Sequence, residues 1–251
     1  MPTTPGPLFD LSGRVALITG AGQGMGVGVA RALARQGARV AVNDLFAERA
    51  QATVEQLRSE GLQALASPAD ITDGVAREAM VTHVRHHLGE IDILVNNAGV
   101  PPGMSTSLRQ FKDLGDADFE RQLDLNLRAV LGLTRLVVGG MCARRFGRMV
   151  IISSESWRVG LSFGLSNYAA AKAAALGFMR QLAHEVGKQG VTANAVSLGT
   201  MNNYGYEDRA SAVGRTGTPD DVGAAVAYLA SAEASWMTGQ VLPLNGGAIT
   251  A

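Results

Sequence analysis

Short apolar runs alternate with helix-like segments from Arg14 almost to the end of the chain. The strand-like runs are 15–18, 38–42, 62–66, 91–95, 149–152, 191–196 and 240–244, of which 62–66 is the weakest. Runs of this length are typical of strands buried on both faces. Glycine marks many helix-to-strand junctions, as expected where helices end. The pattern predicts an α/β fold with a doubly wound parallel sheet of about seven strands, covered by helices on both faces.

The whole pattern fits a single domain. A chain of 251 residues can build one large core, and no linker, internal repeat or second core is visible. Residues 1–12 lack the basic and apolar segments of a secretion signal and are expected to form a loose arm. No uninterrupted apolar run approaches the length of a membrane span.

Charge and cysteine content narrow the range of partners. Lys plus Arg and Asp plus Glu both number 22, so the formal net charge is zero. This balance argues against nucleic acid or an anionic membrane as the main partner. Cys142 is the only cysteine, which excludes an internal disulfide and makes a reducing cytoplasm the expected location.

Tyr168 and Lys172 are the most informative polar pair. They lie four residues apart on a predicted helix, so their side chains project from the same face. An ammonium beside a phenol favours the phenolate and lowers the phenol pKa from about 10. The pair predicts a general acid–base group, although this spacing also arises by chance on solvated helices.

A glycine-rich turn follows the first predicted strand. Gly20, Gly24 and Gly26 lie between that strand and a helix expected over 27–36. Glycines let the backbone approach a pyrophosphate, and free amides at a helix start favour its charge. The spacing is not G-x-G-x-x-G, but the strand–turn–helix order predicts a dinucleotide site.

The TGxxxGxG pattern at 19–26 and the YxxxK pattern at 168–172 together resemble the short-chain dehydrogenase/reductase family. The resemblance covers the chain from about Gly13 to Gly247. It implies a Rossmann-type fold, a nicotinamide cofactor, and hydride transfer between a small-molecule secondary alcohol and its ketone. Family members often form tetramers through alanine-rich helices like the one expected over 168–186, so a homotetramer is expected.

The cofactor is expected to be NAD rather than NADP. Asp44 ends the second strand, where a carboxylate can accept hydrogen bonds from ribose hydroxyls and repel a 2′-phosphate. NADP-preferring members usually carry a basic residue where this chain has Gln23 or Leu45. Capping of the helix that starts near Ala47 is a second, compatible role for Asp44.

The resemblance implies further cofactor contacts. Asp70 would meet the adenine amine, with capping of the next helix as the alternative role. Asn97 would tie the sheet together beside the cofactor. Asn203 stands where the family has a threonine that meets the nicotinamide carboxamide, and Thr200 is a nearby alternative. The full expected set is Gly20, Gln23, Gly24, Met25, Gly26, Asp44, Asp70, Ile71, Asn97, Ala98, Gly99, Tyr168, Lys172, Gly199 and Asn203.

The implied catalytic set is Ser154, Tyr168, Lys172 and Asn126. Ser154 matches when counted from the strand, but it lies 14 residues before Tyr168, where the family usually shows 13. Glu155 occupies the shorter spacing, and a one-residue insertion in the loop would explain the difference. Ser153 and Ser156 are alternatives to Ser154.

Asn126 would bend its helix and hold a water beside the lysine, unless it is simply an exposed asparagine. Leu198 stands where the family has proline before Gly199. Arg158 is expected either to pair with an anionic substrate group or to be exposed. The segment 200–214 is shorter than usual and predicts an open pocket for a bulky substrate.

Metal binding is not expected. His83 and His87 share a helix face, but no third ligand is apparent.

The leading function, from the motifs above, is an NAD-dependent secondary-alcohol dehydrogenase. The alternatives are a 3-oxoacyl-thioester reductase or 3-hydroxyacyl dehydrogenase, and a non-catalytic NAD-binding sensor.

Overall fold

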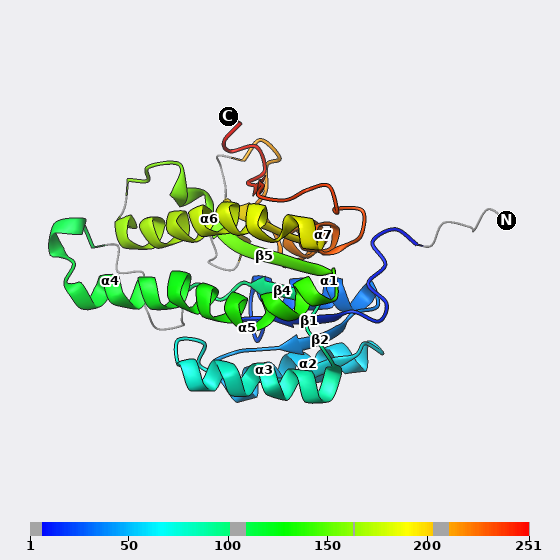
Figure 1. Ribbon diagram of the computed structural model, residues 1–251. Coiled ribbons are helices and arrows are strands. Elements are labelled where there is room, and N and C mark those ends of the chain that lie inside the picture. The colour runs from blue at the N-terminus through cyan, green and yellow to red at the C-terminus, as the bar shows by residue number, and fades with distance from the viewer. Residues whose placement is uncertain (1–6, 101–108, 163, 203–210, 251) are drawn as a thin grey trace.

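A parallel sheet forms the centre of the molecule (Figure 1). The computed structural model describes residues 7–100, 109–162, 164–202 and 211–250. In this part of the chain the seven strands are ordered β3-β2-β1-β4-β5-β6-β7. Their bounds are β1 Val15–Ile18, β2 Arg39–Val42, β3 Ala64–Ala66, β4 Ile93–Asn96, β5 Gly147–Ser154, β6 Val191–Leu198 and β7 Val241–Leu244. The strand order reverses between β1 and β4, so the predicted Rossmann-type sheet is confirmed.

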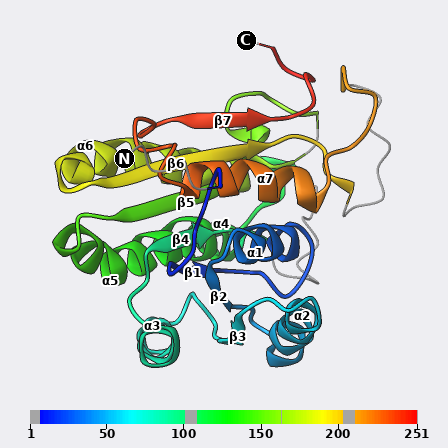
Figure 2. The same cartoon turned by 90° about the vertical axis from the view of Figure 1, so that its right-hand side faces the viewer.

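Helices cover both faces of this sheet. Figure 2 shows α1, α2 and α7 on one face and α3, α5 and α6 on the other. The main helices are α1 Met25–Arg35, α2 Ala47–Ser59, α3 Gly74–Leu88, α4 Asp116–Leu123, α5 Ala129–Ala143, α6 Ser166–Val186 and α7 Pro219–Ala230. The shorter turns are η1 Phe111–Asp113, η2 Asp124–Arg128, η3 Glu155–Trp157 and η4 Gly187–Gln189.

Each face of the sheet carries its own core, which explains the continuous apolar runs. In β1, Ala16 and Ile18 pack under α1, α2 and α7, whereas Val15 and Leu17 pack under α3, α5 and α6. All four side chains are buried. Side chains alternate between the faces of a strand, and here both faces exclude water.

The central strands extend beyond their apolar runs. β5 and β6 are eight residues each, whereas the sequence predicted 149–152 and 191–196. Their pairing continues in register as far as Ser154 with Leu198. Polar residues at these ends are strand because neighbouring strands pair with them, which intrinsic propensity does not reveal. The extension places Ser154 at the carboxyl-terminal edge of the sheet.

One helical run continues from α4 through η2 into α5. It spans Asp116–Ala143 and contains an apolar stretch of 18 residues with a mean hydropathy of 1.3, so by length and composition alone it could cross a membrane. Core helices pass the same test, and 44% of the apolar stretch is buried inside the molecule. Its inward side packs on the sheet, including Leu133 and Val137.

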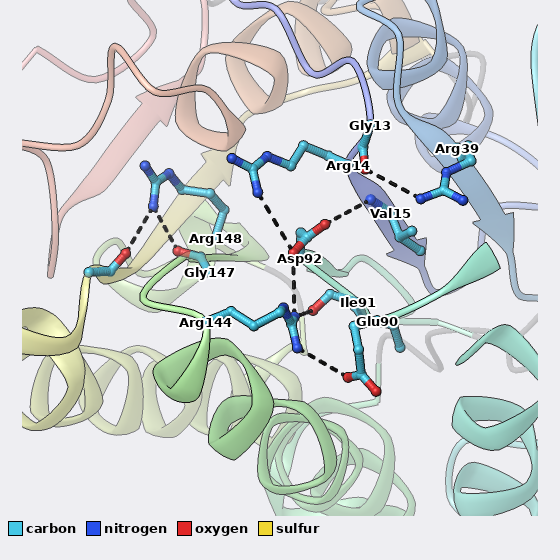
Figure 3. A network of polar contacts seen from close by, with 11 residues as sticks. Gly13, Arg14, Val15, Arg39, Glu90, Ile91, Asp92, Arg144, Gly147 and Arg148 are labelled. Carbon is cyan, nitrogen blue, oxygen red and sulfur yellow. Dashed lines mark hydrogen bonds and ion pairs between the residues drawn. The ribbon is translucent and has the colours of Figure 1, made fainter. Parts of the chain in front are cut away.

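A polar network ties strands together at the amino-terminal edge of the sheet (Figure 3). Asp92 precedes β4 and accepts a hydrogen bond from the backbone of Val15 at 3.2 Å. Its other oxygen lies 3.4 Å from Arg144 and 4.0 Å from Arg14. Buried Arg148 donates to the carbonyls of Gly147, Gly190 and Ser231. Burial, and secondarily nearby Arg14, lowers the pKa of Arg148.

Candidate active site

The turn between β1 and α1 has the shape of a phosphate cradle. Gly20 and Gly24 have φ values of 61° and 58°, a region that favours glycine. A Cβ on Gly26 would lie only 2.7 Å from the Cα of Ala21. No side chain caps the start of α1, so its first amides remain available to an anion. The local geometry therefore fits the predicted pyrophosphate site.

Asp44 lies at the end of β2 and is buried. Its carboxylate accepts hydrogen bonds from the amides of Gly22 and Phe46, both at 3.1 Å. A Cβ on Gly22 would approach Asp44 Oδ2 to 2.7 Å, so this glycine permits the close contact. Phe46 is itself the residue before α2, so Asp44 also supports the start of that helix.

Asp70 and Ile71 lie on the loop after β3. The side chain of Asp70 accepts hydrogen bonds from the backbone and hydroxyl of Thr72 at 2.8 and 2.7 Å. The cap of α3 is Asp73, whose side chain accepts from Val75 and Ala76. Helix capping by Asp70, the alternative role, is therefore wrong.

Asn97 joins the ends of β1 and β4. Its amide donates to the carbonyls of Thr19 and Gly20, both at 2.9 Å. Thr19 Oγ1 in return accepts from the backbone of Asn97 and Ala98. The two loops that border the glycine turn are thereby locked together.

Lys172 and Tyr168 lie together on α6. Lys172 is 4% exposed, and its Nζ lies 5.7 Å from the centre of the Tyr168 ring. The same Nζ donates to the carbonyl of Ile152 at 2.8 Å. Burial lowers the pKa of Lys172 to about 8. The ammonium is thus held in a site where small changes in its surroundings alter its charge near neutral pH.

Asn126 lies in η2, a single turn of π-helix between α4 and α5. It is 1% exposed, so the alternative of an exposed asparagine is wrong. Its amide donates to the Gly99 carbonyl at 3.0 Å and to Gln122 Oε1 at 2.8 Å. Its Oδ1 has no partner among the described residues. A Cβ on Gly99 would lie 3.5 Å from this oxygen and 3.3 Å from Lys172 Nζ, so both face one small polar space.

Ser154 ends β5, and its Oγ accepts from the amide of Ser156 at 3.3 Å. Ser153 and Ser154 both line the cavity described below, whereas Glu155 and Ser156 do not. The carboxylate of Glu155 turns instead to Arg158 and Asn245. Arg158 is therefore an ion-pair partner within the protein and only 21% exposed, so the alternative of an exposed arginine is wrong, while a contact with a substrate anion stays a prediction.

One cavity of about 1010 Å³ joins these groups. It extends from the glycine turn to the catalytic candidates at the carboxyl-terminal edge of the sheet. The expected residues that line it are Gly20, Gln23, Gly24, Met25, Asp44, Asp70, Ile71, Asn97, Ala98, Gly99, Ser154, Tyr168, Lys172 and Gly199. Gly26 and Asn126 are not among the residues that line it, and Asn203 lies outside the described residues.

Sequence reasoning missed two charged residues of the wall, Arg121 and Asp124. Both precede Asn126 in the same helical run, which is the signal that could have found them. Arg121 pairs with Asp118. Within the described part of the chain, no cluster of His, Cys, Asp and Glu is arranged to hold a metal ion.

A family model described as short chain dehydrogenase matches residues 14–210. This chain belongs to the short-chain dehydrogenase family. The predicted resemblance is thereby confirmed, and the glycine turn and the Tyr–Lys pair are parts of a short-chain dehydrogenase cavity.

Relatives with curated functions match nearly the whole chain. The (2S)-[(R)-hydroxy(phenyl)methyl]succinyl-CoA dehydrogenase subunit BbsD of Thauera aromatica is 36% identical, over 95% of this chain and 98% of that protein. The 3-oxoacyl-[acyl-carrier-protein] reductase FabG of Escherichia coli K12 is 34% identical, with the same coverage. Among solved structures, a 7α-hydroxysteroid dehydrogenase complexed with NADH and 7-oxo glycochenodeoxycholic acid superimposes with a TM-score of 0.88, at 31% identity and 97% coverage of each chain.

Proposed function

We propose that this short-chain dehydrogenase uses NAD to interconvert a secondary alcohol and its ketone. The observation that carries the proposal is that Ser154, Tyr168 and Lys172 line the same cavity as the glycine turn. A proton acceptor for an alcohol and a cradle for a dinucleotide are therefore next to each other.

The described residues fit a nicotinamide dinucleotide. The uncapped start of α1 would hold the pyrophosphate, and the carboxylate of Asp44 would accept from the ribose hydroxyls. When bound, the nicotinamide supplies a hydride acceptor or donor. Arg49 is a basic residue near Asp44, but its guanidinium lies over the Phe46 ring, 4.3 Å from its centre. This arrangement favours NAD over NADP.

The proton path follows from the polar groups around Lys172. Ser154 Oγ would hold the substrate oxygen, and the Tyr168 phenol would take its proton. The ammonium of Lys172 favours the phenolate of Tyr168. A water between Lys172 and the open Oδ1 of Asn126 would carry the proton onward, because that buried acceptor has no partner among the described residues.

The names of the relatives favour a second candidate, a 3-hydroxyacyl or 3-oxoacyl thioester as substrate. A coenzyme A or carrier-protein substrate is best matched by a basic rim. Of the charged residues in this helical run, Arg121 and Asp124 line the cavity, and they form ion pairs with Asp118 and Arg128 respectively. This balance favours a substrate without a large anionic carrier.

A substrate panel tests both candidates and the sensor alternative. Steroids, aryl alcohols, small diols and 3-hydroxyacyl thioesters are each offered with NAD and with NADP, and nicotinamide absorbance is followed. Turnover of free alcohols with NAD supports the proposal, and turnover of thioesters alone supports the second candidate. Binding of NAD without turnover on any class would support a non-catalytic sensor.

We also propose a homotetramer. The outward side of α6 carries the exposed small residues Ala170, Ala174 and Gly177, which allow another helix to approach closely. Among the described residues, β7 is an edge strand that pairs with β6 alone, and nearby Trp236 is fully exposed. Light scattering coupled to gel filtration gives the mass, and Ala174→Arg should reduce it.

A further inference from the structure

Glu155 is a buried charge that the proposed reaction does not use. It follows Ser154 directly and is 6% exposed, but it does not line the cavity. Its Oε2 accepts from Arg158 Nε at 2.8 Å and from Asn245 Nδ2 at 3.1 Å, and Arg158 Nη2 lies 2.7 Å from it. Three donor groups therefore converge on one oxygen, while Oε1 has no partner among the described residues.

The sheet register explains why these residues meet. Ser154, Leu198 and Leu244 are paired across β5, β6 and β7. The next residue of each strand is Glu155, Gly199 or Asn245, so these three form the first row beyond the sheet. Strands lie about 4.8 Å apart, so a bond from the first of these positions to the third must pass the middle one.

Gly199 leaves room for this bond. A Cβ on Gly199 would lie 2.8 Å from both Cα and Cβ of Asn245, which only glycine avoids. The Gly199 amide also donates to the Leu244 carbonyl at 3.0 Å. Asn245 in turn binds Ile249 and Gly247 at the C-terminal turn. The Glu155 carboxylate thus links two parts of the site. One is the serine turn, residues 154–157, and the other is the Gly199 wall, the side of the cavity that Gly199 lines.

Ser154 needs such support from its surroundings. Its hydroxyl has a long contact, 3.3 Å, with the amide of Ser156 in the same turn. The η3 turn that follows is held to β6 by Trp157, whose indole donates to Ser197 Oγ at 3.1 Å. Glu155 adds a charged connection to β7, two strands away.

We propose that Glu155 is a positioning residue, which fixes Ser154 relative to the Gly199 wall through Arg158 and Asn245. The inference rests on the proposed dehydrogenase function. Glu155 touches neither substrate nor cofactor in this proposal. Its loss would leave the Arg158 charge without this partner and release the serine turn from the C-terminal segment.

Glu155→Gln tests the proposal against a matched control, Glu60→Gln. Glu60 is likewise a carboxylate in an ion pair, here with Arg31 and Arg35 at 2.9 Å each, but it lies at the end of α2 away from the cavity wall. Glu155→Gln should lower kcat by about 10- to 100-fold, because small misplacements of reacting groups are costly. The dissociation constant for NADH should match that of Glu60→Gln, and the melting temperature should fall only modestly, because the glutamine oxygen can still accept from Arg158.

Trp157 supplies a readout that does not need turnover. The chain has two tryptophans, and replacing exposed Trp236 by phenylalanine leaves Trp157 as the reporter in the serine turn. In that background Glu155→Gln should shift the emission to the red and increase quenching by acrylamide, and Asn245→Ala should do so less. Glu60→Gln should leave both unchanged.

Two results would overturn the positioning role. One is unchanged Trp157 emission in Glu155→Gln. The other is a loss of NADH affinity together with kcat and unfolding at the assay temperature, because Glu155 would then be required for the stability of the whole fold. Absence of wild-type turnover on every substrate would refute the proposed function instead, and the Trp157 emission would still decide the role of Glu155.

Discussion

The two edges of the sheet differ in whether their buried polar groups have hydrogen-bond partners within the protein. At the amino-terminal edge, the protein itself supplies partners for Asp92 and Arg148. At the carboxyl-terminal edge, Asn96, Asn126 and Ser153 keep buried polar atoms without partners among the described residues. A buried unpaired group costs roughly 1–3 kcal/mol, and it persists where a ligand or ordered water supplies the missing bond.

We infer that the amino-terminal edge of the sheet serves mainly stability and the carboxyl-terminal edge mainly chemistry. The amino-terminal network holds β1, β4 and β5 together, whereas the carboxyl-terminal edge keeps groups open for substrate, cofactor and water. The separation is not complete, because Thr192 Oγ1 near the start of β6 also has no partner in the described part of the chain. Substitutions at the two edges should nevertheless affect different quantities.

Tyr168→Phe should have the largest effect. Removing the phenolic oxygen removes the proposed proton acceptor, so kcat should fall about 1000-fold, or about 4 kcal/mol in activation free energy. NADH affinity and unfolding free energy should change little. The control is Tyr228→Phe on the opposite face, where the ring packs edge-on against Phe9. Retained turnover in Tyr168→Phe would remove this residue from the mechanism.

Asp92→Ala should produce the opposite pattern at the other edge. The loss leaves Arg14 and Arg144 without this buried carboxylate and should lower the unfolding free energy by about 3 kcal/mol. Urea unfolding measures this change, while kcat at low temperature should stay near the wild-type value. Glu90→Ala is the control in the same network, and its half-exposed side chain should contribute less than about 1 kcal/mol. A specific loss of kcat in Asp92→Ala would show that the edges are coupled.

Lys172→Met should stabilise the fold while it stops turnover. The pKa of this lysine falls from 10.5 to about 8 on burial. The unfolded chain therefore binds more protons between these values, so wild-type stability rises with pH across this window. Below about pH 8 the variant should be more stable by about 2 kcal/mol, after allowing about 1 kcal/mol for the lost bond to Ile152.

Urea unfolding at about pH 7 and about pH 10 measures this effect. The advantage of Lys172→Met should be greatest at the lower pH and shrink at the higher one. Lys188→Met, at an exposed position, is the control and should show no such trend. Equal stability of Lys172→Met and wild type at both pH values would mean that burial of this ammonium carries no penalty.

Local patterns predicted the sheet and much of the cavity wall. The apolar runs of β1 and β4 and the glycines of the first turn are patterns of neighbouring residues, so the sequence alone predicts these elements. The end of β5 and the contact of Glu155 with Asn245 depend on residues about 40 and 90 positions away, which no local pattern encodes. The sequence consequently predicted Ser154 at the end of its strand but not the contact between Glu155 and Asn245.

Asp44→Ala should have the smallest effect of the four, a change in cofactor preference. Without the carboxylate, the repulsion of a 2′-phosphate is lost and the ribose hydroxyls lose their acceptor. The ratio of kcat/KM for NADP over NAD should rise by about tenfold, or about 1.4 kcal/mol. Asp70→Ala is the matched control, because it removes the same charge from another part of the cavity wall, where adenine is expected to bind, and should affect both cofactors alike. An equal loss with both cofactors in Asp44→Ala would mean that Asp44 only supports the turn around Gly22 and Phe46.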